Sequence, residues 1–154
     1  MLDQVNAKLG FQGNYELDAR QVRTLWEWCR YEATSNLDGS SPWCLAFSIA
    51  NNAVLDYHDD LDFFYNQGFG FSNRRLAENI NCGLVQDLLR YLQSDNPNEE
   101  RARIYGTHSS TLQLFIVSMG LFEDDIPMTR HNFAQQTLRQ WRTGVITPKG
   151  ANLA

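Results

Sequence analysis

The fold class is decided by residues 102–120, which read ARIYGTHSSTLQLFIVSMG. Residues 102–107 form a short segment that favours a strand, and residues 109–120 carry apolar side chains at helical spacing before a terminal glycine. A strand that passes through His108 into a helix is typical of α/β proteins. Because no second strand is clear in the chain, we expect an α-rich α/β protein with an incomplete sheet.

Three long helices are predicted upstream, over residues 15–33, 49–65 and 76–93. Asp18 suits the start of the first helix, and Gly68 suits the end of the second. The third helix is expected to turn five apolar side chains inward: Ile80, Leu84, Leu88, Leu89 and Leu92.

The remaining segments give weaker signals. Ser41-Pro42 predicts a short helical turn. Residues 94–101 are almost free of apolar side chains, which predicts a surface loop. Further on, residues 130–142 fit either a helix or an extended segment, and residues 145–153 fit an extended tail.

Length and charge restrict the function classes. The 154 residues, 43% of them hydrophobic, fit one globular domain with a real core. A net charge of -5 argues against a protein that binds nucleic-acid phosphates or anionic lipid. No window approaches the ~18 consecutive apolar residues of a membrane span, and the first residues do not resemble a signal peptide. Three cysteines leave the redox compartment open.

The first candidate site is the turn around His108. Ligands of α/β proteins bind beyond the carboxyl ends of strands, and the start of a helix offers free N–H groups and a positive dipole end. The His108 imidazole and the hydroxyls of Ser109, Ser110 and Thr111 are therefore candidate anion ligands. Helix capping by the same hydroxyls is the alternative.

Two other clusters give weaker indications of a binding site. His58, Asp59 and Asp62, in the run YHDDLD (57–62), have the residue types and the helical spacing of metal ligands, but no second ligand cluster accompanies them and a solvated acidic face is the simpler explanation of the run. The loop of residues 68–71, which reads GFGF, precedes Arg74-Arg75 and could present an arginine pair to phosphate.

Positive charge is also scattered near the C-terminus. Arg139, Arg142 and Lys149 lie there, and solubility is a sufficient explanation for them. The chain contains no activated-thiol, phosphate-loop or dinucleotide-binding motif. Local sequence patterns alone therefore leave one candidate site, the anion-binding turn around His108.

Several medium-strength motifs, taken in order, resemble the histidine acid phosphatases, most closely their multiple inositol polyphosphate phosphatase branch. The resemblance covers nearly the whole chain from about Val22. The motifs are WCRYE (28–32), SPWCLAF (41–47), LDY (55–57) with DL (60–61), FYNQGFG (64–70), GTHSSTL (106–112), MGLF (119–122), WRTGVITP (141–148) and ANL (151–153).

The resemblance implies an α/β sheet domain with a large helical insertion. Residues 1–100 would be the mostly helical insertion, and residues 101–154 a partial phosphatase core. It also implies hydrolysis of phosphomonoesters such as inositol hexakisphosphate, without metal or other cofactor. His108 matches the family's second, phosphate-binding histidine, with Thr107 and Ser109 beside it as substrate-binding residues.

This sequence departs from the family pattern in two places. The nucleophile motif R-H-G-x-R-x-P has no match, because the only Arg-His pair, Arg130-His131, continues with Asn132. Ser110 stands where the branch has its proton-donating glutamate, and a hydroxyl does not donate a proton as a carboxylic acid does at pH 7. Both changes predict that this chain lacks turnover.

The resemblance also implies a disulfide between Cys29 and Cys44, worth about 3 kcal/mol through loop closure. Cys82 would then be free or paired elsewhere. A secreted or endoplasmic-reticulum location of the parent protein fits such a bridge.

We therefore expect a C-terminal fragment or truncated form of an inositol polyphosphate phosphatase-like protein, inactive by itself. The alternative is a non-catalytic module that binds phosphorylated ligands or a protein partner, and the oligomeric state stays open.

Overall fold

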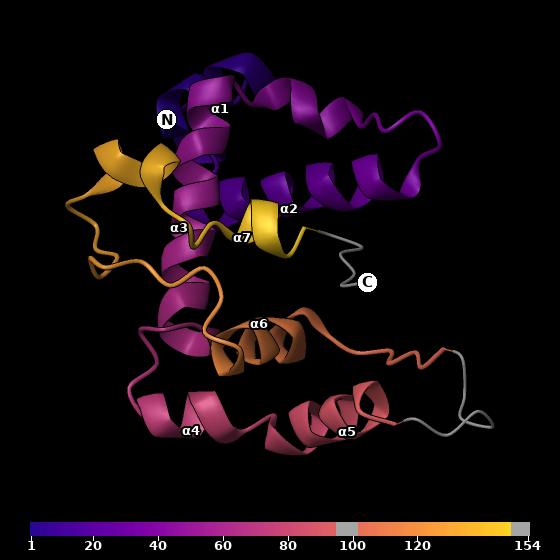
Figure 1. The fold of residues 1–154 in the computed structure, drawn as a ribbon. Coiled ribbons are helices and arrows are strands. Elements are labelled where there is room, and N and C mark those ends of the chain that lie inside the picture. The colour runs from indigo at the N-terminus through magenta and orange to yellow at the C-terminus, as the bar shows by residue number, and fades with distance from the viewer. Residues whose placement is uncertain (95–101, 149–154) are drawn as a thin grey trace. The chain divides into compact units, whose positions relative to one another are not determined.

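The protein is described by a computed structural model that covers residues 1–94 and 102–148 (Figure 1). The chain divides into two compact units. We call Met1–Asp59 with Pro148 the N-terminal unit and Asp60–Thr147 the C-terminal unit. This division concerns compactness, so the expected boundary at residue 100 stays a prediction.

The N-terminal unit is helical. Asp18 ends an extended segment, and its carboxylate accepts the N–H of Gln21 at 2.8 Å while the Gln21 side chain accepts the N–H of Asp18 at 2.9 Å. This reciprocal capping box confirms the helix start predicted at Asp18. The elements of the unit are α1 (Leu2–Leu9), η1 (Gly13–Tyr15), α2 (Ala19–Ser35), η2 (Pro42–Ala46) and the first part of α3 (Ile49–Gln67).

The core of the N-terminal unit is one apolar cluster contributed by all of its α-helices and η2. Half-buried side chains such as Leu17 and Leu25 pack around it. Asn6, which is buried, exchanges two hydrogen bonds with the backbone of Leu17 and so pins the segment before α2. The buried members are Val5, Val22, Trp26, Cys29, Ala46, Phe47 and Leu55.

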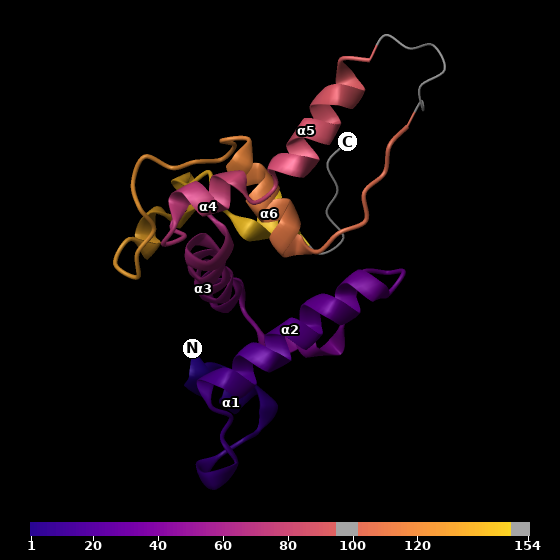
Figure 2. The ribbon, with the colours of Figure 1, turned by 90° about the horizontal axis from the view of Figure 1, so that it is seen from below.

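The C-terminal unit contains the rest of α3 and five further elements. They are α4 (Arg74–Asn79), α5 (Cys82–Leu92), α6 (Ser109–Ser118), η3 (Phe133–Leu138) and α7 (Thr143–Ile146). α6 lies against α4 and α5, as both views show (Figures 1 and 2). The largest side chains of this unit that are less than 2% exposed are Trp141, Ile116 and Met128.

The third long helix predicted over residues 76–93 is two helices. α4 ends at Asn79 and α5 begins at Cys82, because Asn81 turns its side-chain amide to the carbonyl oxygen of Thr111 at 3.1 Å. The expected burial is also wrong, since Ile80, Leu84, Leu88, Leu89 and Leu92 are all half-buried or exposed. Within the described residues α5 packs on α6, which covers its apolar stripe only in part.

The strand expected at residues 102–107 is not formed. No strand occurs among residues 1–94 and 102–148, so this segment has no neighbouring backbone to pair with. Side chains hold it instead, because Arg103 Nη1 lies 3.0 Å from Asp87 Oδ1 and the Tyr105 hydroxyl donates to Asp87. That hydroxyl contact, with Arg103 beside it, lowers the pKa of Asp87.

The segments with weaker sequence signals agree with the structure in part. The short turn after Ser41-Pro42 is η2, and within residues 130–142 the chain forms the 3-10 turn η3. The tail expected to be extended begins as the helical turn α7, and residues 149–153 lie outside the described part, as do 95–101 of the predicted loop. None of the described helices has the length and hydropathy to cross a membrane.

Candidate functional site

The candidate site is the start of α6. His108 is the N-cap residue, with extended backbone (φ -92°, ψ 160°), and no side-chain hydrogen bond caps the helix there. Thr107, His108 and Ser109 are exposed, and Ser110 is half-buried. The N–H groups of a first helical turn have no intrahelical acceptor and carry the positive end of the helix dipole. The imidazole of His108 therefore lies at a position that favours an anion.

α6 is anchored behind this exposed start. Its first turn receives the hydrogen bond from Asn81 to the carbonyl oxygen of Thr111. Further along, the side chains of Ile116 and Val117 are buried almost completely. The accessible part of α6 is thus its N-terminal end.

The loop at residues 68–71, which the sequence suggested could present an arginine pair to phosphate, is tightly packed. Phe69 is buried, and its ring meets that of Trp141 edge-on at 5.7 Å between centroids. Phe64 packs edge-on against the same indole at 6.3 Å. A Cβ atom at Gly68 would lie 2.7 Å from Cζ2 of Trp141 and 2.8 Å from Cα of Phe64, so the close packing requires glycine.

Arg74 is held by carboxylates of the protein. Its Nη1 and Nη2 donate to the two carboxylate oxygens of Glu123 at 2.6 and 2.9 Å, and its Nε donates to Glu78 at 2.6 Å. These contacts raise the pKa of Arg74 and lower the pKa of Glu123. Arg74 is therefore not a free phosphate ligand, and only the exposed Arg75 remains from the predicted pair.

The suggested metal-ligand cluster on α3 has other partners. Asp59 is buried and accepts from Arg23 Nη2 at 3.0 Å and from Arg30 Nη1 at 2.7 Å. Asp62 accepts from the side-chain amide of Asn66 at 2.8 Å. The described residues contain no group of three His, Cys, Asp or Glu side chains that could hold a metal ion.

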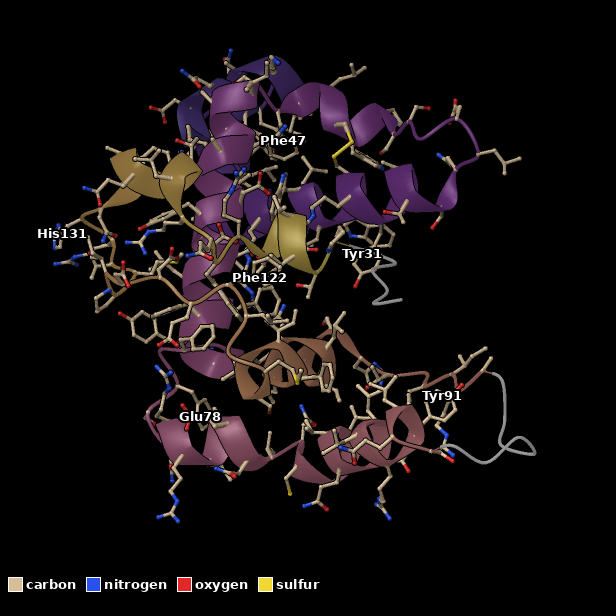
Figure 3. The ribbon with its side chains drawn as sticks, in the orientation of Figure 1. Tyr31, Phe47, Glu78, Tyr91, Phe122 and His131 are labelled. Atoms are coloured by element: carbon tan, nitrogen blue, oxygen red, sulfur yellow. A yellow bond between two sulfur atoms is a disulfide. The ribbon has the colours of Figure 1, made fainter. Side chains whose placement is uncertain are left out.

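The Arg130-His131 pair lies in an exposed loop, in which Figure 3 labels His131. Arg130 Nε donates to His131 Nε2 at 3.1 Å. Arg139, assigned to solubility from the sequence, is instead buried. Its guanidinium donates to the carbonyl oxygens of Ile126 and Pro127 and so ties the loop before η3. Arg142 is half-buried, and Lys149 lies outside the described residues.

The predicted disulfide is present. Cys29 of α2 and Cys44 of η2 are bonded, and Figure 3 shows the bond in yellow near Phe47. It closes a loop of 15 residues within the N-terminal unit. Cys82 is a free, exposed thiol.

Sequence reasoning missed the buried polar residues behind α6. Asp60 belongs to the acidic run of residues 57–62, for which the sequence predicts a solvated face, yet it is 5% exposed and accepts two hydrogen bonds from Thr143. Gln113, 1% exposed, bonds Thr147. A polar residue amid the apolar run of α6 was the one available signal for Gln113.

Comparisons with known proteins agree on one family. The family model described as histidine phosphatase superfamily (branch 2) matches residues 1–154. Multiple inositol polyphosphate phosphatase 1 of Drosophila melanogaster is 34% identical over 151 residues, which cover 98% of this chain and 31% of the relative. The human protein of the same name is 29% identical over 161 residues, covering 99% of this chain and 32% of the relative.

A phytase of Candida albicans is 27% identical over 139 residues, covering 89% of this chain and 28% of the relative. The chain thus spans about a third of the length of the curated relatives it matches. No solved structure shows a significant match to it. The family match extends over the full chain, and it includes the segment in which an exposed histidine stands at the start of α6. The chain therefore belongs to the histidine phosphatase superfamily, branch 2.

Proposed function

We propose that this chain carries the phosphate-binding histidine of an inositol polyphosphate phosphatase-type site, with His108 as that residue. The observation that carries the proposal is the place of His108, exposed at the N-terminal end of α6 with no capping bond. Thr107 and Ser109 flank it and are exposed as well. An imidazole, two hydroxyls and the free amides of a helix start match the oxygen-rich surface of a phosphate group.

In the parent reaction a phosphomonoester of an inositol polyphosphate is hydrolysed. The family chemistry transfers the phosphoryl group to a histidine and then to water, and an acid protonates the leaving alcohol oxygen. This sequence contains no R-H-G-x-R-x-P motif, and Ser110 occupies the place of the acid. A serine hydroxyl keeps its proton near neutral pH, so we propose that the chain by itself binds phosphate without turnover.

The proposed parent architecture is a histidine phosphatase sheet domain with a helical insertion, of which this chain is a fragment or truncated form. Residues 102–107 would be one strand of that sheet. Ile104 supports this role, because it is a β-branched side chain that is 91% exposed in a segment without helix. The relatives are about three times as long, which leaves room in them for the pairing strands.

A secretory or lumenal compartment is proposed for the protein. The support is the Cys29–Cys44 disulfide, since such bonds persist in oxidising compartments and are rare in the cytosol.

The test is a nuclear magnetic resonance titration of the 154-residue chain with inositol hexakisphosphate. The His108 imidazole signals should shift, with a dissociation constant of about 1 mM, which corresponds to about two charge-assisted hydrogen bonds. His108→Ala should weaken binding about tenfold or more, and the matched control His131→Ala should leave it unchanged. An affinity that is the same in His108→Ala and the unsubstituted chain would refute the role of His108.

A phosphate-release assay on the same ligand between pH 4 and 7 tests the second half of the proposal. The expected result is no release. Release that His108→Ala abolishes would show that the chain turns over and would refute the claim of inactivity.

The alternative is a non-catalytic binding module, and the observation that favours it is the serine at position 110. A dissociation constant in the micromolar range for the isolated chain would support this alternative. Millimolar affinity supports a partial site.

A further inference from the structure

Four buried polar residues of the C-terminal unit are joined in series by hydrogen bonds of their side chains and backbone. Gln113 Nε2 donates to Thr147 Oγ1 at 3.0 Å, and this hydroxyl donates to the carbonyl oxygen of Thr143 at 3.3 Å. The backbone N–H and the hydroxyl of Thr143 both donate to Asp60 Oδ1 at 2.6 Å. Each of the four residues is 9% exposed or less. The chain of bonds therefore links α6 through α7 to α3.

The apolar side chains of α6 do not select its rotation. Between Leu112 and Val117 every residue except Gln113 is apolar, and a helix that is apolar all round buries similar area in several rotations. Gln113 is nevertheless the most buried of them apart from Ile116, while Leu114 and Phe115 are only half-buried. A directional hydrogen bond explains why a polar side chain occupies the inward position.

The rotation of α6 determines where His108 faces. An isolated helix of 10 residues is marginal in water, so its placement depends on tertiary contacts. His108 lies five residues before Gln113, about 7.5 Å along the axis at 1.5 Å per residue. If the next residue along the helix faced inward in place of Gln113, the start of α6 would be rotated by about 100° about the helix axis. The exposed imidazole would then point in a different direction.

We propose that Gln113 and Thr147 are positioning residues, whose hydrogen bond sets the rotation of α6 about its axis and thereby directs His108 toward the bound phosphate. This inference rests on the proposed role of His108 as a phosphate ligand. Gln113 and Thr147 themselves are buried and act through the helix.

A stability measurement alone would not reveal this role. Gln113 Oε1 is buried without a hydrogen-bond partner among the described residues. Such an acceptor disfavours folding, so an apolar side chain of similar size is expected to leave the free energy of unfolding unchanged or raise it. Gln113→Leu should therefore separate the positioning of α6 from the stability of the fold.

The experiment compares Gln113→Leu and Thr147→Val with two controls in the full 154-residue chain. Thr147→Ser keeps the hydroxyl, and Gln86→Leu makes the same glutamine change at an exposed position of α5. The first readout needs no ligand: the periodic variation of backbone residual dipolar couplings along α6 reports its rotation relative to α4. The second readout is the dissociation constant for inositol hexakisphosphate, followed at the His108 imidazole.

We expect Gln113→Leu and Thr147→Val to shift the phase of the coupling pattern and to weaken binding about fivefold, the equivalent of one hydrogen bond of about 1 kcal/mol. Thr147→Ser and Gln86→Leu should stay within about twofold of the unsubstituted chain, a difference of less than one such bond. The urea midpoint of Gln113→Leu should be unchanged or higher.

An unchanged coupling phase in both Gln113→Leu and Thr147→Val would overturn the inference, whatever the affinity. A shifted phase with unchanged affinity would overturn the link to ligand binding. If His108→Ala leaves the affinity unchanged, the proposed function fails. In that case the ligand-free couplings still decide whether Gln113 sets the direction of His108.

Discussion

Reduction of the Cys29–Cys44 disulfide is expected to lower the free energy of unfolding of the protein by about 3 kcal/mol. The bond closes a loop of 15 residues between α2 and η2, and the chain-entropy relation gives about 3 kcal/mol for a loop of that length. Cys29 is 7% exposed and belongs to the apolar cluster, whereas Cys44 lies at its edge. Reduction keeps both sulfur atoms in place, so it tests the loop closure without opening a cavity.

The assay is thermal unfolding followed by circular dichroism, with and without a phosphine reductant. About 3 kcal/mol corresponds to a decrease in Tm of about 6–12 °C for a chain of this size. The double variant Cys29→Ala, Cys44→Ala should melt at or below the reduced protein, because it also removes buried sulfur atoms. Cys82→Ala is the control, since that thiol is exposed and unpaired and should not alter the response to reductant.

A reductant-dependent change in Tm smaller than about 1 °C would refute this reasoning, because it leaves far less than the closure entropy of the loop. The same conclusion would follow if the double variant responded to reductant as strongly as the unsubstituted chain.

Three further predictions concern single contacts. Asp18→Ala should cost about 1 kcal/mol in urea unfolding, because α2 loses its capping box, and no change would contradict the role of the cap. Gly68→Ala should cost about 1–3 kcal/mol by overpacking against an indole carbon at 2.7 Å, whereas Gly83→Ala, with open space around it, should be neutral or stabilising. Arg74 hydrogen-bonds the Glu123 carboxylate and so lowers the pKa of Glu123 in the folded protein below the usual 4.5. The pair therefore stabilises the fold fully above pH 4.5, and this stabilisation is lost as the pH falls through the lower pKa of the folded state. The carboxyl carbon shift of Glu123 should give a pKa below 4.5, and this pKa should rise toward 4.5 in Arg74→Met. A Glu123 pKa at the usual value in the unsubstituted chain would refute the contact.

Two arginine side chains of the C-terminal unit are already bound by other groups of the protein. Arg74 binds Glu123 and Glu78, and Arg139 is buried against backbone carbonyls. Neither guanidinium is therefore available to phosphate as the structure stands. The millimolar affinity expected for the isolated chain follows from this, because His108 and the amides of one helix start would act without an arginine clamp.

Local sequence patterns predicted the helix boundaries well where both partners lie within one turn. The start of α2 follows from Asp18 and Gln21, which cap each other three residues apart. The end of α3 next to Gly68 and the start of α6 after His108 were likewise readable. The break between α4 and α5 was not, because the side chain of Asn81 finds its acceptor 30 residues away.

The candidate site was predicted only in its exposed part. His108 could be named because a helix start and a family motif coincide at one position. Asp60 looked like part of a solvated acidic run, and nothing within one turn of it shows that its carboxylate would be buried. Its partner Thr143 is 83 residues away, so their pairing depends on how α3 and α7 pack.

The sequence by itself determined the first two long helices, the helix after His108, the family and the candidate histidine, since these depend on spacing, capping and short motifs. The tertiary structure alone decided the rotation of α6, the burial of Asp60 and Gln113, and the lack of a partner strand for residues 102–107 within the described chain. The physical reason is that hydrogen bonds and strand pairing need groups that packing brings together from distant positions. No local pattern contains that information.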